Sequence, residues 1–152
     1  MHSIDVFLQD RQLIRQALAG LSEEAYFNMP QSFDNNIAWN LGHIIVTQQA
    51  LHYRLSGQPT LTNKEDVAMF KTGSSPAEWT SRPDIERLLG LLVETGPKLQ
   101  DDYAAGLFTT FRPYTTFTGI ALRTIEDALA FNNFHEGLHL GTILALRNFV
   151  LG

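Results

Sequence analysis

The stretch WNLGHIIVTQQALHYRLSG (residues 39–57) decides the fold prediction. At about 100° per residue, its apolar side chains form two stripes on opposite sides of an α-helix. The first stripe, which begins just before the quoted residues, consists of Ile37, Leu41, Ile44, Leu51 and Leu55. The second consists of Trp39, His43, Val46 and Ala50. A helix with two apolar sides packs against neighbours on both, which predicts a helix over about residues 35–56 inside a bundle.

Three further stretches have the apolar spacing of helices. They are residues 3–19, a stretch that follows Ser81 as N-cap and reaches Leu99, and residues 124–149. Gly96-Pro97 is expected to kink or interrupt the middle one. Ser32 or Asp34 is available to cap the helix over residues 35–56.

The connections complete the fold prediction. Residues 57–80 are rich in Gly, Pro and Ser and predict a long crossover with at most a short helix around residues 64–71. Residues 107–119 predict loop or short extended structure. The sequence therefore predicts an all-α, four-helix bundle in a single domain, residues 1–152, with a long crossover between the second and third helices.

Composition narrows the range of functions. The 152 residues carry a net charge of −5 and no long basic cluster, which argues against nucleic acid as a partner. The chain has no cysteine, so any metal must be held by His, Asp or Glu. Neither a signal peptide nor a membrane span is recognisable, so we expect a cytoplasmic protein with no membrane partner.

Three of the five histidines are candidate metal ligands. His135 and His139 are four residues apart, so they share one face of the last helix, together with apolar side chains. A single buried histidine is usually a satisfied core residue, but two buried imidazoles need partners for four ring nitrogens. His43 lies on an inward stripe of the second helix, so two helices can bring three imidazoles together. Three neutral histidines leave open positions on a divalent ion, as a catalytic metal needs.

The remaining two histidines carry less weight as ligands. His52 is about half a turn around the helix from His43, so the two cannot share a site from one face. We expect His52 to be structural or exposed. His2 lies at the chain terminus and is not expected to contribute to a site.

The letters HEGLH (residues 135–139) also match the H-E-x-x-H motif of zinc proteases. Such proteases need a third ligand downstream, but the thirteen residues after His139 contain no His, Asp or Glu. Thr142 and Ala145 stand where the extended motif needs Gly and His. The sequence therefore argues against a protease. Glu136 remains a candidate general base, with a link to a polar group on a neighbouring helix as the favoured alternative.

Two segments resemble the DinB-like superfamily, which includes the YfiT-type proteins. They are residues 39–57 and FNNFHEGLHLGTILALRNFV (residues 131–150), where an H-x-x-x-H pair precedes a glycine and an apolar tail. The resemblance implies a four-helix bundle with up-down-down-up connections. It places metal ligands on His43, His135 and His139, with nickel or zinc as the metal, and it implies a homodimer.

The resemblance also implies a range of activities. Characterised relatives include transferases and isomerases that depend on low-molecular-weight thiols such as bacillithiol or mycothiol. The leading hypothesis is a metal-dependent enzyme, specifically a thiol-dependent S-transferase that acts on a small electrophilic molecule. The alternatives are a metal-dependent hydrolase of a small molecule and a non-catalytic, stress-related binding module. We expect residues 58–80 and 107–119 to determine specificity.

Overall fold

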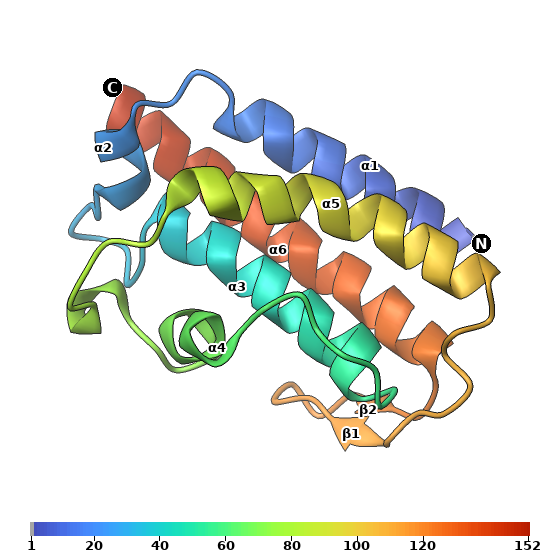
Figure 1. Ribbon diagram of the computed structural model, residues 1–152. Helices are drawn as coiled ribbons and strands as arrows, with labels where there is room; N and C mark the ends of the chain where they lie inside the picture. Colours follow the sequence, from blue (N-terminus) through green and yellow to red (C-terminus); the bar gives the residue numbers. More distant parts are fainter. Residues whose placement is uncertain (1) are drawn as a thin grey trace.

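Four long helices form the molecule. The computed structural model describes residues 2–152 (Figure 1). The long helices are α1 (His2–Leu18), α3 (Ile37–Gln49), α5 (Ile85–Ala104) and α6 (Ile125–Leu151). They lie side by side as a bundle, and α3 continues into a π-helical turn, η1 (Ala50–Arg54). The prediction of an all-α protein is confirmed.

Short elements fill the connections. They are α2 (Glu23–Phe27), α4 (Lys64–Phe70), the 3₁₀ turn η2 (Pro76–Glu78), and the strands β1 (Tyr114–Thr115) and β2 (Ala121–Leu122). The two strands pair antiparallel, with Tyr114 opposite Leu122. The short helix predicted in the crossover is α4. The sequence prediction missed α2, because five residues are too few to display a helical period.

Some predicted helix boundaries were wrong. Asn36 caps α3 by accepting a hydrogen bond from the Trp39 amide, and Asp84 caps α5 in the same way. The predicted caps, Ser32 or Asp34 for α3 and Ser81 for α5, lie upstream of the observed ones. The predicted interruption at Pro97 was also wrong, since α5 runs through it. Pro97 lies on the exposed side of α5, where water can satisfy the carbonyl that loses its amide partner.

The core surrounds α3, as its two apolar stripes predict. Ile37, Leu41 and Ile44 are fully buried, and His43 on the other stripe is 4% exposed. The largest apolar cluster combines these α3 side chains with Leu88 from α5 and with the α6 residues Ile143 and Leu146. α3 is therefore the central helix, in contact with α4, α5 and α6.

A buried ion pair joins α1 to α6. The Arg11 guanidinium donates from Nε and Nη2 to the two carboxylate oxygens of Glu136, both at 2.7 Å. The side chains are 4% and 0% exposed. Arg11 Nη1 donates to Thr95 Oγ1 on α5 at 3.1 Å, and Asn132 Nδ2 donates to Glu136 Oε1 at 3.0 Å. The network therefore ties three of the four long helices together.

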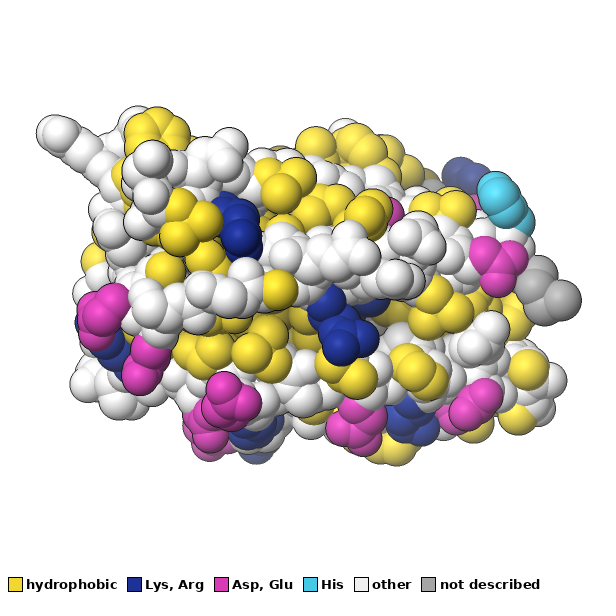
Figure 2. Space-filling model, turned by 90° about the horizontal axis from the view of Figure 1, so that it is seen from above, with side chains coloured by type: hydrophobic (Ala, Val, Ile, Leu, Met, Phe, Trp, Pro, Cys, Tyr) yellow, Lys and Arg dark blue, Asp and Glu magenta, His cyan; other side chains and the backbone are white. Residues whose placement is uncertain are grey.

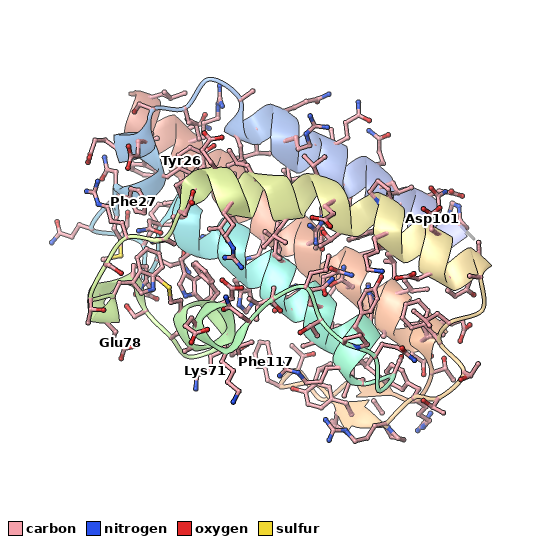
Figure 3. The ribbon with its side chains drawn as sticks, viewed as in Figure 1. Tyr26, Phe27, Lys71, Glu78, Asp101 and Phe117 are labelled. Atoms are coloured by element: carbon pink, nitrogen blue, oxygen red, sulfur yellow. The ribbon has the colours of Figure 1, made fainter. Side chains whose placement is uncertain are left out.

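The surface carries charges of both signs. Figure 2 shows acidic and basic side chains interspersed with hydrophobic ones on the face seen from above. On the crossover, Lys71 and Glu78 are exposed and point away from the bundle (Figure 3). Within residues 2–152, no helix combines the length and apolar character needed to cross a membrane.

Glu136→Gln tests the energetic role of the ion pair. The substitution leaves the Arg11 guanidinium buried without a counter-charge, so we expect the free energy of unfolding to fall by about 3–5 kcal/mol. Urea denaturation measures this change, with Glu94→Gln on the exposed face of α5 as the matched control. A loss below about 1 kcal/mol, the size typical of an exposed pair, would contradict a stabilising role.

Candidate metal centre

Three imidazoles meet between α3 and α6. His43 projects from α3, and His135 and His139 project from successive turns of α6. One nitrogen from each ring lies within 4.8 Å of the other two. His43 Nε2 and His135 Nε2 are 3.0 Å apart. The structure thus brings together the three histidines that the sequence singled out, and they form a group that could hold a metal ion.

The spacing fits a shared divalent ion. Two metal–nitrogen bonds of about 2.0–2.1 Å hold their nitrogens about 3.3–3.4 Å apart at a tetrahedral angle and about 2.9 Å apart at a right angle. The 3.0 Å between His43 Nε2 and His135 Nε2 lies between these values. Two unprotonated nitrogens at this distance repel each other, so either a proton or a cation must lie between them.

Hydrogen bonds at Nδ1 set the orientation of two rings. His43 Nδ1 is 2.7 Å from the Phe70 carbonyl oxygen and must donate to it. His139 Nδ1 is 2.7 Å from Asn40 Oδ1. Asn40 Nδ2 already donates to Asn35 Oδ1 and to the Asn36 carbonyl, so its oxygen is the acceptor for His139. Both rings therefore carry their proton on Nδ1 and keep the Nε2 lone pair for a metal.

Burial keeps all three imidazoles neutral near pH 7. It lowers the pKa of His43, against the opposing effect of the Phe70 carbonyl. Burial and the neighbouring imidazoles lower the pKa of His135 to about 3 and that of His139 to about 4. Because only a neutral imidazole has a free lone pair, the site is ready for a cation without first releasing protons.

Aromatic rings and one hydroxyl surround the imidazoles. Trp39 stacks on His43 with ring centroids 4.5 Å apart and an interplanar angle of 10°. Phe131 lies nearly parallel to His135 at 6.3 Å. Thr47 Oγ1 is 3.5 Å from His43 Nε2, so a hydroxyl lies beside the candidate ligand atom. His135 and His139 are half-buried, so part of their surface remains exposed.

Glu136 lies between the two α6 histidines in sequence but belongs to another network. Its carboxylate is fully buried, and both oxygens accept hydrogen bonds from Arg11. This is the link to a neighbouring helix that the sequence favoured for Glu136. A carboxylate committed to a guanidinium is poorly placed to take a proton, so general-base chemistry by Glu136 stays a prediction without geometric support.

The other two histidines lie outside the candidate metal centre. His52 is fully buried in η1, which agrees with a structural role. Gln48 Nε2 donates to its Nδ1 at 3.1 Å, which assigns the remaining proton to Nε2. His52 Nε2 lies near the Ala128 carbonyl, but it has no partner in hydrogen-bonding geometry within residues 2–152. His2 is exposed at the start of α1.

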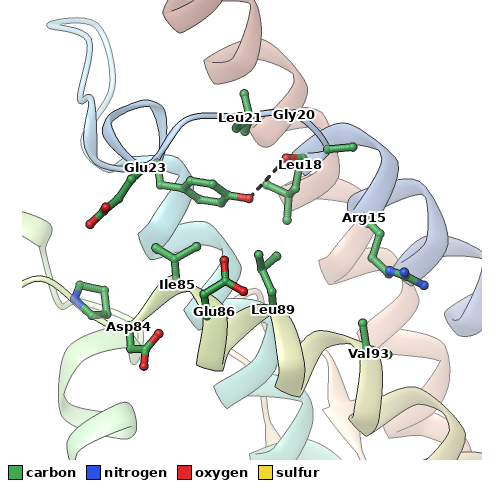
Figure 4. Close-up of a pocket in the computed structure, with 13 residues that line it drawn as sticks. Arg15, Leu18, Gly20, Leu21, Glu23, Asp84, Ile85, Glu86, Leu89 and Val93 are labelled. Carbon is green, nitrogen blue, oxygen red and sulfur yellow. Dashed lines mark hydrogen bonds between the residues drawn. The ribbon is translucent and has the colours of Figure 1, made fainter.

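A cavity of about 560 Å³ lies elsewhere in the bundle, between the end of α1 and the start of α5 (Figure 4). Arg15, Glu86 and Leu89 are among its lining residues. Tyr26 spans one wall, where its hydroxyl donates to the Leu18 carbonyl at 3.3 Å. None of the three clustered histidines lines this cavity, so it is separate from the candidate metal centre.

Sequence reasoning missed the groups that orient the imidazoles and the partner of Glu136. Asn40 was detectable, because it is a polar residue one turn before His43 on the same helix. Arg11 was detectable as a charged residue spaced four from Phe7 and three from Ile14 on the apolar side of α1. The Phe70 carbonyl had no signal, because a backbone group leaves no trace in the sequence.

Family comparison agrees with this geometry. Residues 7–143 match the model of the DinB superfamily, which covers most of the chain. The chain therefore belongs to the DinB superfamily, as the two signature segments predicted. A comparison with curated proteins gives no match.

The buried His52 gives a prediction for pH dependence. Burial lowers the pKa of His52 to about 3, whereas an unfolded chain takes up the proton near pH 6.5. Its contribution to stability is therefore complete above pH 6.5 and is lost as the pH falls toward 3. For this residue alone, we expect a loss of about 2 kcal/mol between pH 7 and pH 5.

The measurement compares wild type with His52→Gln by urea denaturation across this pH range, in the presence of a chelator. The variant should lose less stability on acidification, whatever its stability at pH 7. His2→Gln, which removes an exposed histidine, is the matched control. Identical pH slopes for wild type and His52→Gln would show that His52 does not titrate as its burial requires.

Proposed function

We propose that the protein binds a divalent metal ion, zinc or nickel, through His43, His135 and His139 and uses it in chemistry on a small molecule. The observation that carries the proposal is the convergence of three neutral imidazoles, two of them held at Nδ1. Nitrogen ligands suit both metals. A divalent ion there would act as a Lewis acid that lowers the pKa of a bound water or thiol.

The protein's own side chains around the histidines orient the imidazoles and the bound molecule, and they supply no nucleophile. Asn40 and the Phe70 carbonyl orient two imidazoles, and Trp39 covers the outer face of His43. Thr47 offers a hydroxyl to a molecule bound beside His43. His135 and His139 keep part of their surface exposed, which gives a small molecule access.

Thiol-dependent transfer is the activity that we favour. The chain has no cysteine, so a sulfur nucleophile must come from a low-molecular-weight thiol. Three neutral ligands leave the positive charge of a divalent ion uncompensated, which favours an anionic ligand such as a thiolate. The half-buried Phe131 lies nearly parallel to His135 and suits an apolar electrophile.

A hydrolase is the second candidate, and it has one obstacle. Hydrolysis by a bound water benefits from a nearby general base. Glu136 is the carboxylate nearest in sequence, but it is engaged by Arg11. A non-catalytic, stress-related binding module would use the same histidines without turnover.

We also propose that the protein is a homodimer. An exposed apolar stripe on α6 supports this proposal, with Phe134, Leu138 and Phe149 52%, 56% and 60% exposed. These side chains follow helical spacing, so they form one face that a second copy could cover. Sedimentation equilibrium measures the association, and a monomer at all concentrations would refute it.

His139→Ala tests the ligand set. Wild-type protein purified without a polyhistidine tag is expected to bind one zinc or nickel ion per chain. The variant should lose more than about a hundred-fold in affinity, beyond the usual effect of an outer hydrogen-bonding partner. Elemental analysis and competition with a chelating dye measure both quantities. His52→Gln is the matched control, and unchanged binding by His139→Ala would refute the assignment.

Product analysis separates the two enzyme classes. We expect metal-loaded protein to form a C–S bond between a low-molecular-weight thiol and a small aryl or alkyl halide, with loss of the thiol proton and release of the halide ion, and no product when the thiol is omitted. Mass spectrometry identifies the thioether. Turnover of activated esters without thiol would instead support a hydrolase, and no turnover in either assay would favour the binding module.

A further inference from the structure

The crossover helix α4 contacts the metal site through its last residue. The Phe70 carbonyl accepts the hydrogen bond from His43 Nδ1 at 2.7 Å. Carbonyls at the end of a helix have no partner within that helix. This carbonyl is therefore free to fix both the tautomer and the ring orientation of His43. α4 therefore supplies none of the three histidines, but its last carbonyl orients one of them, His43.

Gly42 determines how closely α4 approaches α3. A Cβ atom at Gly42 would lie 2.4 Å from Cγ and Cδ1 of the Phe70 ring. Phe70 is 1% exposed, and its ring also packs edge-on against Trp79 at 5.7 Å. The ring therefore has little room to move, and only glycine next to His43 permits the observed contact.

The rest of α4 is anchored away from the histidines. Asn63 and Asp66 form a capping box at its start. Both oxygens of Asp66 accept hydrogen bonds from Arg87 on α5, each at 2.7 Å. The start of α4 is thereby fixed to α5, while its end lies on Gly42 of α3.

The segment after α4 reaches His43 from another direction. Trp39 stacks on the His43 ring, and Trp39 Nε1 donates to Ser74 Oγ at 3.0 Å. Ser74 Oγ in turn donates toward the carbonyls of Met69 and Lys71, at the end of α4. The crossover thus holds His43 both by its Nδ1 proton and through the ring stacked on it.

We propose that α4 is a latch for the metal site, in which docking of Phe70 on Gly42 and metal binding at His43 stabilise each other. The inference rests on the proposed three-histidine site and adds a coupling to it. A docked α4 presents His43 Nε2 to the ion. Because coupling between two equilibria is reciprocal, a bound ion also holds α4 in its docked position.

Gly42→Ala is the central test. The new methyl group forces the Phe70 ring away, so the bond from His43 Nδ1 lengthens or breaks. We expect zinc and nickel affinity to fall about ten- to a hundred-fold, the usual cost of losing such a partner. Gly90→Ala is the matched control, since a Cβ on this α5 glycine meets nothing within 4 Å. Wild-type affinity in Gly42→Ala would overturn the latch.

Two readouts separate positioning from general loss of stability. In metal-free wild type, ¹⁵N shifts of His43 should report a proton fixed on Nδ1, whereas Gly42→Ala should give a mixture of tautomers. Amide exchange of residues 64–71 should slow when zinc is added to wild type. Unchanged tautomers in the variant, or unchanged exchange on metal addition, would overturn the coupling.

A second variant, Arg87→Gln, tests the latch if Gly42→Ala does not fold. Arg87→Gln removes the anchor of Asp66 without changing Phe70 or a histidine, so we expect faster amide exchange in α4 and several-fold weaker metal binding. Arg82→Gln, which breaks an exposed pair with Glu24, is its control. Wild-type affinity in Arg87→Gln with faster exchange would refute the latch alone, whereas wild type that binds no metal would refute the site itself.

Discussion

The buried ion pair between Arg11 and Glu136 is the constraint around which the bundle is arranged. Two charges removed from water are tolerated only when each finds nearly all its partners in the protein. Thr95 and Asn132 supply the additional hydrogen bonds, so α1, α5 and α6 must meet at this level. The pair also fixes the rotation of α6 about its axis. With Glu136 turned toward α1, His135 and His139, which lie about 100° and 60° from it around the same side of α6, are turned toward His43 on α3.

This geometry explains which parts of the fold could be read from the sequence. The double stripe of α3 predicted a central helix because burial on two sides leaves no polar face. The four-residue spacing of His135 and His139 predicted a common face because helical geometry is local. Helix ends were less predictable, because several polar residues could cap α3 and the choice of Asn36 depends on the path of the preceding loop. Pro97 was misread because its effect depends on which side of α5 faces water.

The sequence predicted the three histidines of the candidate site, but it did not predict the groups that orient them. Histidines are rare, and their spacing and position on apolar stripes identified all three. Arg11 occupies a core position on α1, yet a single charge in an apolar stripe is easily overlooked without knowledge of its partner. Glu136 illustrates the limit of a short motif, since the H-E-x-x-H letters suggest a reactive carboxylate and give no sign of Arg11. Its partner lies 125 residues away in the chain, and only the folded structure connects them.

The contacts that orient His43 show why the irregular crossover matters to the chemistry of the candidate site. A three-histidine site needs every Nε2 directed at one point, and each imidazole can rotate about two side-chain bonds. Hydrogen bonds at Nδ1 remove this freedom at the time of folding rather than at the time of binding. For His139 the acceptor is a side chain of α3 itself. For His43 it is a carbonyl at the end of α4, where small changes in docking alter ring orientation directly. A change of sequence in the crossover that moves this carbonyl would therefore alter the candidate metal centre without any change in its three histidines.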